Sequence, residues 1–196
     1  MDEAVRLERD PVCGMMVGER ERQVVYRGVG YAFCSQQCRE RFISAPRLYV
    51  GRRGLLAPKQ KGVEVIKRRC MVPASPLTQA QFTELRAALL SMMGVIAVRP
   101  VERMVDGRRE PWRVEGETPV PPCIEAAEVS YDLLQATAEQ LDRKIVELNA
   151  TLSNGWGEKL QRDFIHYLEQ CELEDLVMHA TGQSRERLQA NTKEKR

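Results

Sequence analysis

The spacing of apolar residues predicts strands and helices in a mixed order along most of the chain. Apolar and polar residues alternate over 62–68, 94–100 and 126–132, which is the period of strands with one buried face. Helical spacing covers 79–93 and 137–148, and Thr78 is the expected N-cap of the first helix. That helix carries an apolar stripe formed by Phe82, Leu85, Leu89 and Met92. The pattern therefore predicts an α+β domain in which helices cover a sheet.

The first fifty residues follow a different plan, with a hairpin and one short helix. Strand-forming residues at 23–26 and 31–33 flank a turn that contains Gly28 and Gly30. Ser35 is a natural N-cap for a helix over 36–43, which must end before Pro46. A segment this short cannot bury enough apolar surface to fold unaided, so a bound metal is the usual supplement.

The end of the chain predicts one long helix and a polar tail. A further strand would belong near 150–156, but Gly155 and Gly157 predict a turn there instead, and 158–180 has helical spacing. The helix has an apolar stripe that should pack on the domain or on a second copy in a homodimer, and the stripe consists of Leu160, Phe164, Leu168, Cys171 and Leu176. Residues 184–196 are expected to be a short helix that frays into a disordered tail.

These patterns predict four parts. Residues 1–51 form the small module, 52–62 a linker of Gly, Pro, Arg and Lys, 63–152 the α+β domain with a polar, proline-rich insertion at 102–123, and 153–196 a helical extension.

Composition is that of a folded protein, because 43% of the 196 residues are hydrophobic and 30% are charged. We find no apolar run that could span a bilayer, and the charged start is unlike a secretory signal, so a cytoplasmic location is expected. The six cysteines should then stay reduced, which favours metal binding over disulfides. The net charge of +2 combines a basic part up to Arg109 with an acidic part from Glu125 to Asp175.

Three cysteines in the small module have the spacing of metal ligands. Cys34 and Cys38 are four residues apart, which places both sulfurs on one face of a helix. Cys13 comes from a separate loop, where Gly14 allows a tight turn. A closed zinc site needs a fourth ligand, for which solvent, Cys70 and a partner's side chain are the candidates, whereas three thiolates alone would also suit Cu(I).

The same residues carry a resemblance to a known family. The module contains Asp10-Pro11-Val12-Cys13-Gly14-Met15, then Phe33-Cys34-Ser35-Gln36-Gln37-Cys38, then Phe42-Ile43-Ser44-Ala45-Pro46-Arg47-Leu48-Tyr49. Residues 10–50 thereby resemble the YHS family of small metal-binding modules. The resemblance implies a metal site and a knuckle built from a hairpin and a helix.

The second part resembles the heavy-metal-associated domain of copper chaperones and metal-pumping ATPases. The resemblance rests on Met93-Gly94-Val95-Ile96-Ala97-Val98, on Val129-Ser130-Tyr131-Asp132 and on Thr137-Ala138-Glu139-Gln140-Leu141. It implies a ferredoxin-like α/β sandwich, which the order of strands and helices also predicts. That family binds metal through two loop cysteines, whereas only Cys70 stands at this place here, so this domain is not expected to hold copper by itself.

Taken together, these features predict a protein that binds a soft metal ion and acts in metal trafficking, buffering or resistance. Copper is the first choice, as Cu(I), with Zn(II) or mercury as alternatives, and a metal-transporting ATPase or another metal-handling protein is the expected partner. The competing interpretations are a zinc-stabilised nucleic-acid-binding module, which the acidic Glu19, Glu21 and Glu40 disfavour, and a regulatory adaptor. No enzyme signature is present, so an enzyme is not expected. His166 and His179 are expected at the surface or in packing and Cys171 in the core, while the sequence assigns no role to Cys123.

Overall fold

A computed structural model of the chain describes residues 7–18, 23–52, 54–101, 104–105, 108–109, 124–148, 152 and 154–181. The chain divides into two compact units. Unit 1 comprises Met1–Val65, Leu133–Gln135 and Tyr167–Arg196, and unit 2 comprises Ile66–Asp132 and Ala136–His166.

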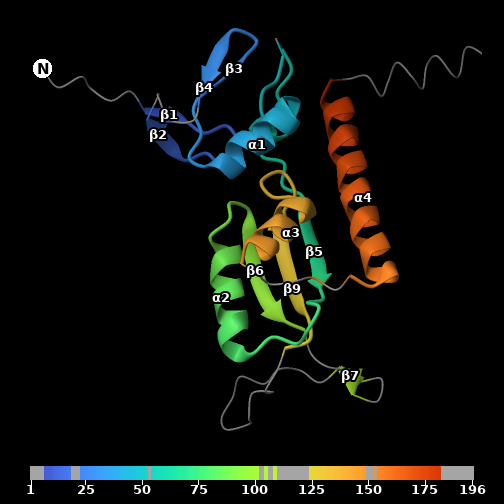
Figure 1. The fold of residues 1–196 in the computed structure, drawn as a ribbon. Coiled ribbons are helices and arrows are strands. Elements are labelled where there is room, and N and C mark those ends of the chain that lie inside the picture. The colour runs from blue at the N-terminus through green and yellow to red at the C-terminus, as the bar shows by residue number, and fades with distance from the viewer. Residues whose placement is uncertain are drawn as a thin grey trace, which may run out of the picture. The chain divides into compact units, whose positions relative to one another are not determined.

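Two small hairpins begin unit 1 (Figure 1). Strand β1 (Leu7–Arg9) pairs antiparallel with β2 (Met16–Gly18), and β3 (Val24–Tyr26) pairs antiparallel with β4 (Val29–Tyr31). The second hairpin turns at Arg27 and Gly28, whose φ angles of 53° and 78° are those of a type I′ turn. We expected its second strand at 31–33, but β4 ends at Tyr31 because Ala32 and Phe33 are fully buried in the core instead.

The core of this unit is a cluster of aromatic rings. Helix α1 (Gln36–Ser44) begins after Ser35, whose side chain caps it as expected, and a short 3₁₀ helix η1 (Pro46–Leu48) follows. Phe42 on α1 is fully buried, and its ring lies 5.1 to 6.0 Å, centroid to centroid, from those of Tyr26, Tyr31, Phe33 and Tyr49. These contacts fix α1 against β3 and β4.

Side chains of the module also hold the segment Leu133–Gln135 of the same unit. The guanidinium of Arg41 donates to the carbonyl of Leu133 at 3.0 Å, the Tyr49 hydroxyl to that of Leu134, and the Gln37 amide to that of Gln135 at 3.2 Å. Three consecutive carbonyls thus have partners from α1 and the residue after η1. A second 3₁₀ helix, η2 (Lys59–Lys61), lies within the range expected to be a linker.

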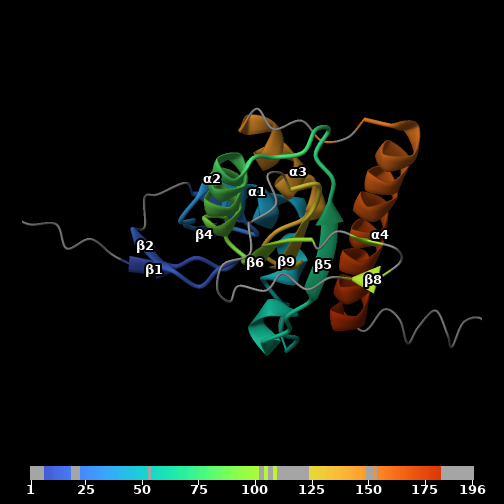
Figure 2. The same ribbon diagram turned by 90° about the horizontal axis from the view of Figure 1, so that it is seen from below.

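Unit 2 is built on a three-stranded antiparallel sheet in the order β5-β9-β6. Strand β9 (Ala127–Asp132) is central, with β5 (Ile66–Met71) and β6 (Val95–Pro100) as its neighbours. Helices α2 (Gln79–Leu90) and α3 (Ala138–Glu147) cover one face of this sheet, as Figures 1 and 2 show from two sides. Both helices begin with a capping box, at Thr78 and Thr137. The core between the layers is formed by Phe82, Leu85, Leu89, Val98, Val129, Tyr131, Leu141 and Ile145.

Strand and helix ends differ from the expected ones. The strand expected at 62–68 is found at Ile66–Met71, because its ladder with β9 runs from the pair Ile66 and Asp132 to the pair Met71 and Ala127. The helix expected to reach residue 93 ends at Leu90, before a turn in which Gly94 has a φ of 87°. Near 150–156, where the glycines predicted a turn rather than a strand, the described residues contain an isolated bridge between Pro73 and Leu152.

The insertion and the C-terminal extension are described in part. Strands β7 (Met104–Val105) and β8 (Arg108–Arg109) form a short pair, while Cys123 and the tail 184–196 lie outside the described residues. Helix α4 (Trp156–Thr181) is present. Three residues of its apolar stripe, Leu160, Phe164 and Leu168, are 54%, 57% and 48% exposed, so they are not covered by the rest of the described chain, and packing of the stripe on a second copy stays a prediction. The buried residues of α4 among those described are Glu169 and Leu173. Among the described helices we find none long and apolar enough to cross a membrane.

Candidate metal centre

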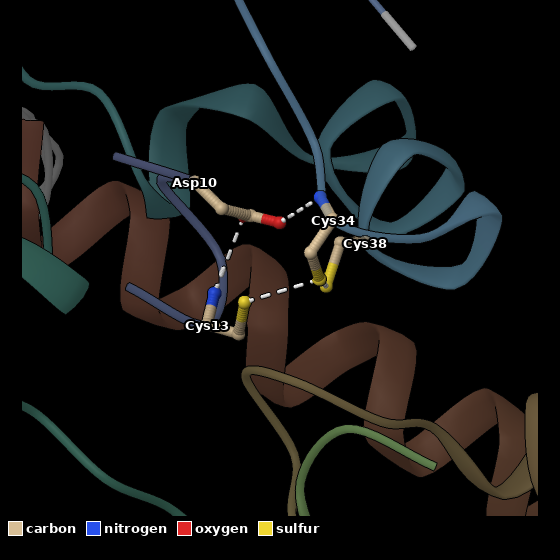
Figure 3. A group of neighbouring side chains, drawn as sticks. All are labelled: Asp10, Cys13, Cys34 and Cys38. Atoms are coloured by element: carbon tan, nitrogen blue, oxygen red, sulfur yellow. Dashed lines mark hydrogen bonds between the residues drawn. The ribbon is translucent and has the colours of Figure 1, made fainter. Parts of the chain in front are cut away.

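Four potential ligands gather in unit 1, three thiols and one carboxylate. One ligand atom from each of Asp10, Cys13, Cys34 and Cys38 lies within 4.8 Å of all the others. Figure 3 shows the three sulfurs close together, with the Asp10 carboxylate beside the backbone of Cys34. This cysteine-rich cluster could hold a metal ion, because thiolate and carboxylate are established metal ligands.

Cys13 is presented by a tight loop between β1 and β2. The Gly14 amide donates to the carbonyl of Asp10 at 2.8 Å, and the Asp10 amide donates to the carbonyl of Met15 at 2.9 Å. Gly14 has a φ of 81°, a conformation that a side chain would strain. The chain therefore reverses its direction around Cys13.

Cys38 lies in the first turn of α1, whereas Cys34 lies before the N-cap, so the two cysteines are not both on the helix as expected. The Cys38 amide donates to the Ser35 hydroxyl at 3.2 Å, and this cap sets where the helix begins. The two sulfurs are 3.6 Å apart, and the positive end of the helix dipole lies beside them. Cys38 is fully buried, whereas Cys13 and Cys34 are half-buried, so the cluster opens to solvent on the side of the latter two.

Asp10 joins the two pieces of backbone that carry the cysteines. Asp10 is buried, with 1% of its surface exposed. Its Oδ1 accepts from the amides of Val12 at 2.8 Å and Cys13 at 3.3 Å, and its Oδ2 accepts from the amide of Cys34, 24 positions away, at 2.9 Å. One buried carboxylate thus fixes the Cys13 loop to the residue that precedes α1.

The spacing of the sulfurs suits a tetrahedral ion. The Sγ atoms of Cys13 and Cys34 are 3.4 Å apart, and those of Cys34 and Cys38 are 3.6 Å apart. Zn–S bonds of roughly 2.3 Å give sulfur separations of about 3.8 Å in a tetrahedron and about 4.0 Å in a plane. The thiols already stand near the separations that a metal ion requires.

The three thiols have very different acidities. Hydrogen bonding from Cys38 lowers the pKa of Cys13 to about 7, against the effect of burial. Burial, followed by the hydrogen bond with Cys13, raises the pKa of Cys34 to about 11. The hydrogen bond to Cys13 and burial raise the pKa of Cys38, and the negative charge of Asp10 acts in the same direction. Cys13 is therefore the first of the three thiols to ionise as pH rises through neutrality.

The structure brings together three of the four residues expected to bind metal. Cys70 is outside this group and lies in unit 2 on β5, paired with Glu128 on the face of the sheet opposite the helices. Asp10 was not predicted as a member of this group, although it begins the Asp10-to-Met15 motif. The available signal was an aspartate two positions before Val12, since Asp side chains commonly accept from the amide two residues on.

The remaining sequence candidates lie elsewhere. His166 is 28% exposed at its side chain and contacts Asp142 in unit 2, and His179 is exposed on α4. Cys171 is half-buried rather than in the core.

No curated protein and no solved structure matches the chain. The resemblance of the second part to heavy-metal-associated domains stays a prediction. Residues 9–53 match the YHS domain family, and this segment contains all four residues of the cluster.

Proposed function

We propose that the protein binds a thiophilic metal ion through Cys13, Cys34 and Cys38 and acts in metal trafficking, buffering or resistance. The observation that carries the proposal is the convergence of these three sulfurs at 3.4 and 3.6 Å within the segment that matches the YHS family. Cu(I), Zn(II) and Hg(II) are the candidate ions, because all three accept thiolate ligands. The role is one of binding and delivery rather than catalysis.

Delivery would proceed by exchange of thiolate ligands with a partner. Cys13 and Cys34 are half-buried, so a thiolate of another protein can approach the ion from their side while the buried Cys38 retains it. A metal-transporting ATPase is a partner of suitable chemistry. The proposal also assigns a reducing compartment such as the cytoplasm, because three thiols this close must stay reduced to bind metal.

Unit 2 would supply the docking surface in this scheme, as a ferredoxin-like domain reduced to three strands. The support is its strand order, β5-β9-β6, with α2 and α3 as the connections on one face. The isolated bridge between Pro73 and Leu152 would be the remnant of a fourth strand next to β5. Self-association through α4 is a further proposal, supported by the exposed Leu160, Phe164 and Leu168, and analytical ultracentrifugation of the metal-free and metal-loaded protein would test it.

The test is metal stoichiometry and affinity in reduced protein. Purified chain is loaded with Zn(II) or Cu(I), passed through gel filtration and analysed for metal. Separate Cys13→Ser, Cys34→Ser and Cys38→Ser variants should each lose at least tenfold in affinity, since each loses a thiolate.

Cys171→Ser is the matched control, because Cys171 is also half-buried but lies outside the cluster, and it should bind like the parent protein. Cys70→Ser tests the fourth-ligand expectation directly: unchanged affinity removes Cys70 from the site. A parent protein that retains neither ion would overturn the proposal as a whole.

A further inference from the structure

The Asp10 carboxylate has more acceptor capacity than the backbone uses. An ionised carboxylate offers about four lone-pair positions, two on each oxygen. Three of these are occupied by the amides of Val12, Cys13 and Cys34. The carboxylate is therefore held rigidly, with one position on Oδ2 left over after these bonds.

The carboxylate also lies beside the three sulfurs of the cluster. One of its oxygens is within 4.8 Å of the Sγ atoms of Cys13, Cys34 and Cys38. An ion bound among these sulfurs would therefore be within reach of the acceptor position that the three amides leave open.

We infer that Asp10 Oδ2 is the fourth ligand of the centre, which makes the site a three-sulfur, one-oxygen tetrahedron that selects a divalent ion over Cu(I). The inference rests on the proposed function, since it needs the three cysteines to bind metal. Asp10 thereby takes the fourth ligand position, for which solvent, Cys70 and a partner's side chain were the candidates.

The selectivity follows from ligand type and charge. Thiolates accept both Cu(I) and Zn(II), but a carboxylate oxygen suits harder divalent ions and adds little for the soft Cu(I). A fourth anionic ligand beside three thiolates also increases their mutual repulsion, which a divalent cation offsets twice as well as a monovalent one. Asp10 is 1% exposed, so water does little to screen that repulsion.

The experiment compares Zn(II) and Cu(I) affinities in the parent protein and in Asp10→Asn, using competition with a chromophoric chelator for each ion. Asparagine keeps the shape and one acceptor oxygen but removes the charge. We expect the Zn(II) affinity to fall about 10- to 100-fold, while the Cu(I) affinity changes by less than about threefold. The Glu40→Gln variant, which alters an exposed carboxylate of α1, is the control and should leave both affinities unchanged.

The ratio of the Zn(II) affinity to the Cu(I) affinity distinguishes a ligand from a residue that only positions the cysteines. If Asp10 only positioned them, the Asp10→Asn variant would leave this ratio unchanged. Equal losses for both ions in Asp10→Asn would overturn the inference, because they would mean that Asp10 only holds the loops. Unchanged affinities for both ions would overturn it as well. As a second readout, the Cd-113 chemical shift of Cd(II)-loaded protein should change between the parent and Asp10→Asn, since a directly bonded oxygen is replaced. If the parent binds neither ion, the proposed function fails first.

Discussion

Asp10 in unit 1 is buried and Asp142 in unit 2 is half-buried, and the hydrogen bonds of their carboxylates differ in kind. Asp10 in unit 1 accepts three backbone amides. Asp142 in unit 2 uses one oxygen, Oδ2, for two basic side chains, Arg69 at 3.0 Å and His166 at 2.9 Å. Its Oδ1 is buried without a hydrogen-bond partner among the described residues. Asp10 shapes the backbone, whereas Asp142 ties side chains of β5 and α4 to α3.

The difference shows what each carboxylate is available for. The partners of Asp10 are backbone amides, which carry no net charge, so these hydrogen bonds hold the carboxylate beside the three thiols without pairing it with a cation. Asp142 is paired with the guanidinium of Arg69, whose side chain is 4% exposed, and this cation compensates its charge in place. The arrangement around Asp10 is suited to a cation-binding site, and the arrangement around Asp142 is that of a structural ion pair.

The largest effect is expected from Asp10→Ala. It leaves three amides of unit 1 without acceptors, so the free energy of unfolding of the metal-free unit should fall by on the order of 4 kcal/mol. Hydrogen exchange measures this by region, and the amides of Val12, Cys13 and Cys34 should lose protection while those of β9 keep it. Loss of protection in β9 to the same degree would show that Asp10 does not act within its own unit.

Asp142→Asn should cost slightly less, about 3 kcal/mol, because it leaves the buried Arg69 without an anion. Denaturation followed by exchange of amides in β5 and α3 measures this loss. Glu147→Gln is the matched control, because it removes a surface salt bridge in which the side chains of Glu147 and Lys144 are 64% and 34% exposed. It should change the free energy of unfolding by less than about 0.5 kcal/mol. Equal effects of the two variants would contradict the role of the ion pair.

The third prediction concerns pH. Between pH 7.5 and 8.5 Cys13 is already ionised, with a pKa of about 7, while the Cys34 pKa is about 11 and that of Cys38 is also raised. Zn(II) must therefore displace protons from the latter two, and its affinity should rise about 100-fold per pH unit. Competition titrations across this range, together with proton release, provide the measurement. A slope near tenfold would mean that only one of these thiols binds.

The same acidities predict how the metal-free unit responds to pH. The lowered pKa of Cys13 favours folding at high pH, and this contribution is lost as pH falls from 9.0 through about 7. The raised pKa values of Cys34 and Cys38 oppose folding once pH exceeds 9.0. Thermal denaturation of metal-free protein should therefore show maximal stability of unit 1 near pH 9, and a steady decline from pH 7 to 9 would contradict this order of acidities.

The smallest effect is expected from His166→Ala. Its side chain is 28% exposed, so its hydrogen bond to Asp142 should contribute about 1 kcal/mol to the stability of unit 2. Chemical denaturation of the variant measures this, with His179→Ala as the exposed control on the same helix. A loss as large as that of Asp142→Asn would mean that His166, rather than Arg69, is the main partner of Asp142.

Local signals in the sequence predicted most of the elements but not their ends. Ser35 and Thr78 cap α1 and α2 as expected, since capping depends on residues only three positions apart. The first strand of unit 2 was expected four residues too early because its limits depend on β9, more than fifty positions away, where Ile66 pairs with Asp132. The α4 stripe was identified by period, yet Leu160, Phe164 and Leu168 are exposed, because period shows which residues share a face but not what covers it.

The sequence by itself determined the three cysteines and their chemistry, because a spacing of four residues across a helix N-cap and a glycine turn are local properties. Only the tertiary structure decided the fourth member of the cluster. Asp10 lies 24 positions from Cys34, and no local pattern indicates that its carboxylate reaches that amide. A ligand set drawn from distant loops is fixed by how the loops pack, and here a single buried carboxylate holds them together.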